Sequence, residues 1–123
     1  VLQVQVNWRH VLEGLEELSS QEIQLRRWTS TSGEISSLVE VVEQVFDDSA
    51  LDYYVQEGGS ELGPEIDRDL QAFGQLLVDF DDSRFTSVEA IVASREMELI
   101  RREALRLHEM VLAAVESEGI TLM

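Results

Sequence analysis

The chain has 123 residues, a formal charge of −16, nine Arg, and neither Lys nor Cys. This charge excludes nucleic acid, whose phosphates need a basic surface, and disfavours an anionic membrane surface as a partner. The lack of cysteine excludes disulfides, thiolate metal sites and a cysteine nucleophile.

The length suits one domain, and 44% hydrophobic residues are enough to build a core without a disulfide or a metal. We therefore expect residues 1–123 to form a single helical domain. No apolar run approaches the roughly 20 residues that span a bilayer, and the first residues lack the basic start and apolar stretch of a signal peptide. These features predict a cytoplasmic protein.

Residues 1–6, VLQVQV, nearly alternate apolar and Gln side chains, as a half-buried strand does. The segment is too short to stand alone. It is either a strand paired with the tail at residues 120–123 or an extended arm.

The remaining chain predicts an all-α fold, because its apolar residues recur at helical spacing with one proline and seven glycines between them. Asn7 is a good cap for a first helix that stops at Ser19. The sequence SSQE at 19–22 has the spacing of a capping box and opens a short helix through Trp28. Residues 29–33 are a loop by composition.

A second capping box, SLVE at 37–40, opens a third helix that ends near Phe46, and another short helix starts at Asp48 or Ser49. The pair GG at 58–59 stops it, and Pro64 occupies a first-turn position. The helix that follows carries the clearest apolar stripe in the chain: Ile66, Leu70, Phe73, Leu77 and Phe80.

A third capping box, TSVE at 86–89, leads through a short helix into a long one at 94–117, with Gly119 as its C-terminal cap. The inward face of the long helix is Met97, Ile100, Ala104, Leu107, Val111 and Val115. We expect a compact bundle of five or six helices, with the 66–80 and 94–117 helices as the central antiparallel pair.

The tetrapeptide FDDS occurs twice, at 46–49 and at 80–83. The offset of 34 residues matches the tetratricopeptide period, but the flanking residues do not correspond, so a structural repeat is not indicated. Each copy predicts a junction in which the aromatic residue closes one apolar stripe and Asp-Asp-Ser caps the next helix.

The sequence predicts no catalytic residue, no metal ligand and no cofactor. His10 and His108 each lack a second histidine at ligand spacing. The segments EGLE at 13–16 and EVVE at 40–43 match the first half of the ExxE, ExxD signature of all-α nucleotide pyrophosphohydrolases, but neither is followed by the second half. A metal-dependent hydrolase that uses helical carboxylates is therefore the alternative function and not the first one.

Two clusters are candidate contacts for a protein partner. Arg and Trp are common binding hot spots, but the favoured interpretation is that Trp28 closes the end of the core beside solvated arginines. The acids suit a basic partner. The candidate partner-binding residues are Asp47, Asp48, Asp52, Glu57, Glu61, Arg26, Arg27 and Trp28.

The last helix offers a third possibility, because Leu99, Leu105 and Leu112 lie off its main stripe. A helix that is apolar on more than one side needs a second surface to cover it. These leucines therefore suggest a homodimer through the last helix.

The segment from Trp28 to Leu51 ends in EISSLVEVVEQVFDDSAL. It resembles a group of small, acidic, helical bacterial proteins of unassigned function, with an early Arg/Trp segment followed by an aromatic-Asp-Asp turn. The resemblance implies a single helical domain and carries over no catalytic residue. In size and charge the chain is also similar to immunity proteins, so the expected function is non-enzymatic docking on a basic protein, in the form of a toxin-neutralising immunity protein or antitoxin.

Overall fold

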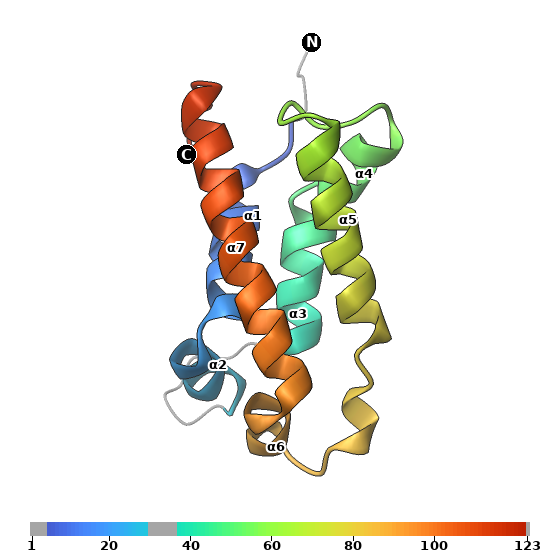
Figure 1. Ribbon diagram of the computed structural model, residues 1–123, viewed down its shortest axis with the longest axis vertical. Helices are drawn as coiled ribbons and strands as arrows, with labels where there is room; N and C mark the ends of the chain where they lie inside the picture. Colours follow the sequence, from blue (N-terminus) through green and yellow to red (C-terminus); the bar gives the residue numbers. More distant parts are fainter. Residues whose placement is uncertain (1–4, 30–36, 123) are drawn as a thin grey trace.

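Four long helical segments pack side by side in the computed structural model, which describes residues 5–29 and 37–122 (Figure 1). Each runs antiparallel to the next along the chain, so the arrangement is an up-and-down bundle. The four segments are α1 (Trp8–Ser19), α3 (Leu38–Glu43) with its continuation η1 (Gln44–Asp48), α5 (Pro64–Asp79) and α7 (Arg95–Ser117).

Three short helices close the ends of this bundle. The helices α2 (Gln21–Trp28) and α6 (Val88–Ala93) lie at one end, and α4 (Leu51–Gln56) lies at the other (Figure 1). A single turn, η2 (Asp82–Arg84), connects α5 to α6. The all-α prediction is confirmed, since residues 5–29 and 37–122 contain no strand. They contain seven α-helices, more than the five or six expected, because each short helix stands as a separate element.

The predicted central pair of α5 and α7 is wrong. The long helix α7 packs most extensively against α1 and less against α5. The apolar face of α1 is broad, and five of its large side chains are buried in the core. They are Trp8, Val11, Leu12, Leu15 and Leu18.

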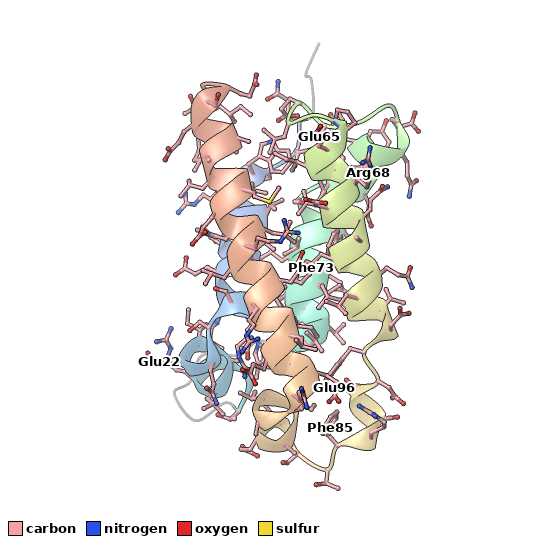
Figure 2. The ribbon with its side chains drawn as sticks, in the orientation of Figure 1. Glu22, Glu65, Arg68, Phe73, Phe85 and Glu96 are labelled. Carbon is pink, nitrogen blue, oxygen red and sulfur yellow. The ribbon has the colours of Figure 1, made fainter. Side chains whose placement is uncertain are left out.

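The apolar stripes of α5 and α7 face the core as predicted. All six residues expected on the inner face of α7 are buried. On α5, Leu70, Phe73 and Leu77 are buried, while Ile66 and the C-cap residue Phe80 are half-buried and pack against the same core. Figure 2 shows Phe73 between α5 and α7.

The predicted helix caps are confirmed at Asn7, whose side chain accepts from the backbone N–H of His10, and at Ser37, which accepts from Glu40. Gly119 follows α7 with a φ of 67°, the left-handed conformation that glycine tolerates best. The other two caps lie one residue later than predicted, at Ser20 and Ser87.

Ser20 replaces Ser19 as the cap because Ser19 is still the last residue of α1, and its hydroxyl donates to the carbonyl of Glu16 at 2.8 Å. The hydroxyl of Ser20 is then the one that accepts from the N–H of Ile23, at 3.2 Å. Where two serines or threonines stand together, the capping-box spacing alone does not choose between them.

At the first FDDS we expected the helix to end near Phe46, but it does not. It continues as one π-helical turn to Asp48, and α4 begins at Leu51 without a side-chain cap from either aspartate. The buried hydroxyl of Ser49 donates to the carbonyl of Val45 at 2.5 Å and accepts from the N–H of Leu51 at 3.2 Å. The turn therefore depends on Ser49.

At the second FDDS the predicted capping is observed. The carboxylate of Asp81 accepts from the N–H and the hydroxyl of Ser83 and so caps η2. The ring of Phe80 stacks on Phe85 with a centroid distance of 5.8 Å. Arg84 lies over Phe85 and pairs with Glu96 at 3.5 Å, and Figure 2 shows Glu96 beside Phe85.

The N-terminal prediction, a strand or an extended arm at 1–6, falls mostly outside the described residues. Gln5 and Val6 form neither helix nor strand, and Val6 is buried. The N–H of Asn7 donates to the carbonyl of Ser49 at 2.8 Å, which ties the start of α1 to the turn before α4. Of the predicted loop at 29–33, only Thr29 is described.

Candidate functional site

A run of acidic residues with no basic residue among them follows α3, η1, α4 and the loop after α4. Residues 37–63 contain seven acidic residues and no Arg, Lys or His. All seven side chains are exposed. They are Glu40, Glu43, Asp47, Asp48, Asp52, Glu57 and Glu61, and we call them the acidic surface.

Several acids on other helices pair with arginines. Arg9 pairs with Glu13 at 2.8 Å, Arg102 pairs with Glu98 at 2.9 Å, and Arg106 reaches Asp69 at 3.5 Å. Within residues 5–29 and 37–122, no Arg forms an ion pair with the acidic surface. The negative potential there is therefore available to a cation from another molecule.

The five acids predicted as partner contacts all belong to this surface, but they are not equivalent. Asp47 and Asp52 are close enough to repel each other. Partial burial, followed by the charge of Asp47, raises the pKa of Asp52 above its usual value. Glu61 accepts a hydrogen bond of 2.5 Å from the indole N–H of the buried Trp8, so it also holds the loop onto α1.

An apolar groove borders the acidic surface. It lies between α3 and the C-terminal half of α5 and has a volume of 260 Å³. We call it the α3–α5 groove. Its apolar wall consists of Leu38, Val39, Val42, Leu77, Val78 and Phe80.

The charged residues of the α3–α5 groove are Glu43 on one side and Asp82 on the other. A second hollow of 120 Å³ adjoins it toward α6 and is lined by Val88 and Ile91. The two hollows share Leu38, Val39 and Asp82 as walls. Together they form one depression that crosses α3 from α5 to α6.

The groove is small for a cofactor or a drug-sized ligand, which needs roughly 300–1,000 Å³ with several convergent polar groups. Its walls instead suit one or two apolar side chains, and its two carboxylates suit a neighbouring cation. No group of three His, Asp or Glu able to hold a metal ion occurs in the described part of the chain. His10 is exposed on α1 and His108 is half-buried on α7.

The second predicted contact cluster, Arg26, Arg27 and Trp28, lies in the last turn of α2. Trp28 is buried, and its indole N–H donates to the carboxylate of Glu17. Arg27 pairs with the same carboxylate, while Arg26 is exposed on α2. Trp28 closes the end of the core and also lines the smaller hollow beside Leu38 and Val39, whereas neither Arg26 nor Arg27 lines either hollow.

The three leucines proposed for a dimer interface do not share one face. Helix geometry separates Leu99 from Leu105 by about 120° around α7, whereas Leu105 and Leu112 lie within about 20° of each other. Leu99 lies with Leu76 in a hollow between α5 and α7, and Leu112 is half-buried. One flat surface of a second α7 could not cover all three.

Sequence reasoning missed Val39 and Val78, which are 59% and 74% exposed. Both lie off the main apolar stripe of their helix. A signal for the acidic surface was present in the sequence, since no basic residue occurs between Arg27 and Arg68.

Comparison of the chain with protein-family models, with curated proteins and with solved structures finds no match. None of the helices in residues 5–29 and 37–122 combines the length and the apolar character needed to cross a membrane.

Proposed function

We propose that this chain is a non-enzymatic protein-binding module that docks its acidic surface on a basic protein. The observation that carries the proposal is the run from 37 to 63, in which seven exposed carboxylates have no basic residue among them. Such a surface attracts a cationic partner over distances comparable to the Debye length, about 10 Å at moderate salt. Attraction of this kind raises the association rate more than it raises the final affinity.

The concrete form that we favour is a toxin-neutralising immunity protein or antitoxin that acts in the cytoplasm. A protein of this type presents carboxylates to the basic active site of its toxin and blocks it. The charge and the helical fold support this form of the proposal by analogy with proteins of that type.

The test uses the purified product of a neighbouring gene that encodes a basic protein, with association rates measured by stopped-flow fluorescence. One variant carries Asp47→Arg, Asp48→Arg and Asp52→Arg. A control carries Glu109→Arg and Glu116→Arg on α7 and Glu118→Arg at its C-cap, which makes the same change of net charge at another exposed site.

We expect the association rate of the first variant to fall by about tenfold or more, and the wild-type rate to fall as salt rises. The control should retain most of the wild-type rate. Equal losses in both variants would mean that the total charge and not the acidic surface governs the encounter. Unchanged rates in the first variant would remove this surface from the proposal.

A further inference from the structure

We infer that the α3–α5 groove receives an amphipathic helix of the partner, one that carries an apolar stripe flanked by Lys or Arg. The inference rests on the proposed function and adds the shape and chemistry of the segment that binds. It differs from simple charge attraction because it requires apolar side chains in a defined position.

The first argument is the exposure of two valines at the mouth of the groove. Val39 and Val78 are 59% and 74% exposed, and they stand on opposite walls of the same depression. An exposed valine alone is ordinary, but two that border a hollow with an apolar lining indicate a surface that a partner can cover.

The second argument is charge complementarity. Glu43 and Asp82 are among the residues that line the groove, and the acidic surface continues from Glu43 along η1 to α4. A helix with basic residues beside its apolar stripe would bury the stripe and place its cations near these carboxylates. A second copy of this chain is a poorer occupant, because each copy carries a formal charge of −16.

The third argument concerns backbone conformation. Partner segments commonly dock either by adding a strand to a sheet edge or by laying a helix into a groove. Residues 5–29 and 37–122 form no sheet, so they offer no edge for a strand. The groove lies between two helices, and a third helix packs there as helices pack on one another in a bundle.

The two adjoining hollows, of 260 and 120 Å³, specify how such a helix would bind. They share a wall at Leu38 and Val39, so they can take two separate side chains. Side chains one helical turn apart lie about 5–6 Å from each other on a helix surface. Two apolar residues at that spacing are therefore the expected anchors.

The test uses three synthetic peptides of about 18 residues, long enough for a stable turn pattern once bound. The first has Leu on one helical face and Lys elsewhere. The second has the same composition in an order that scatters Leu around the helix. The third keeps the Leu face but replaces Lys by Glu. Affinity is measured by fluorescence anisotropy, and the contact residues are mapped by amide NMR shifts on the whole chain.

We expect the first peptide to bind, with shifts concentrated at Val39, Val42 and Val78, and the other two to bind at least about tenfold more weakly. The variant Val78→Asp should weaken the first peptide by about tenfold, because it places a charge where an apolar contact forms. Leu105→Asp is the matched control, since Leu105 is likewise an exposed apolar residue on a helix, at 51%, but lies outside the groove. It should leave the affinity unchanged.

Two results would overturn the inference while leaving the proposed function intact. One is equal binding of the first and second peptides, which would show attraction by charge alone. The other is equal affinity of Val78→Asp and wild type. Light scattering adds a third outcome: a wild-type dimer that Val78→Asp converts to a monomer would assign the groove to a second copy. Binding by neither Lys peptide at any accessible concentration would contradict both the groove and the acidic surface.

Discussion

The indole N–H of Trp28 donates a hydrogen bond of 2.8 Å to Oε2 of Glu17, a carboxylate that is only 2% exposed. The other oxygen of the same carboxylate pairs with the guanidinium of Arg27. Helix α2 buries only Gln24 and Trp28, so apolar contacts alone hold it weakly. The hydrogen bond and the ion pair of Glu17 therefore link the last turn of α2 to α1.

Substitution of the Glu17 carboxylate should lower the free energy of unfolding. Glu17→Gln keeps the size of the side chain but replaces one acceptor by a donor, which then faces the N–H groups of Trp28 or Arg27. We expect a loss of about 2 kcal/mol in the free energy of unfolding, measured by urea denaturation, because a buried donor is left without an acceptor.

The control for this prediction is Glu98→Gln, which removes the exposed ion pair to Arg102. Exposed pairs contribute little, so its effect should stay within about 0.5 kcal/mol. If the two variants lose the same stability, the Glu17 contacts are no more important than a surface pair.

Gly14 should be required on α1 because its helix lies so close to η1. A Cβ at this position would overlap with Cγ2 of Val45, which is fully buried. Gly14→Ala should destabilise by about 1–3 kcal/mol even though alanine favours the helix by about 1 kcal/mol. In the double mutant with Val45→Ala the added methyl has room, so a thermodynamic cycle should give a favourable coupling of about 1 kcal/mol or more. Additive effects would show that the clash is relieved by backbone movement.

Helix positions and inner faces followed from the sequence where burial is one-sided. On α7 the spacing of three and four residues identified every buried position, from Met97 to Val115, because one face of that helix meets the core. The choice of neighbour did not follow. The packing of α7 on α1 joins the two ends of the described chain, and no local pattern encodes it.

The residues of the candidate site also include some whose exposure followed from the sequence and some whose burial did not. Asp47, Asp48 and Asp52 were predicted as partner contacts, and they are exposed, as charged side chains usually are. Glu17 has the same chemistry and sits among other acids of α1, yet it is buried because the turn at Ser20 brings Arg27 and Trp28 over it. Local sequence does not distinguish these cases.

Ala50 holds a conformation that glycine would adopt more easily. Its φ is 67°, and it is the only non-glycine residue with positive φ in the described part of the chain. Ala50→Gly should raise the free energy of unfolding by about 1 kcal/mol because it removes the left-handed strain. Ala72→Gly on the exposed face of α5 should lower it by about the same amount. Opposite signs in thermal denaturation would confirm the strain, and a loss in both variants would contradict it.

The cap formed by Asp81 should be visible in its titration. The hydroxyl of Ser83 and then its backbone N–H hold the pKa of the Asp81 carboxyl below its usual value of 3.8. A carboxyl with a lowered folded-state pKa binds fewer protons when folded than when unfolded, so its contribution to stability is present above pH 3.8 and is lost as the pH falls through the folded-state pKa.

Ser83→Ala removes the larger of the two hydrogen-bond contributions and should raise the pKa of Asp81 toward 3.8, followed through the carboxyl carbon by NMR. Ser87→Ala, which removes the cap of α6 instead, should leave the titration of Asp81 unchanged. If Asp81 titrates alike in wild type and in Ser83→Ala, the hydroxyl does not stabilise the carboxylate, and the junction at the second FDDS depends on the backbone hydrogen bond alone.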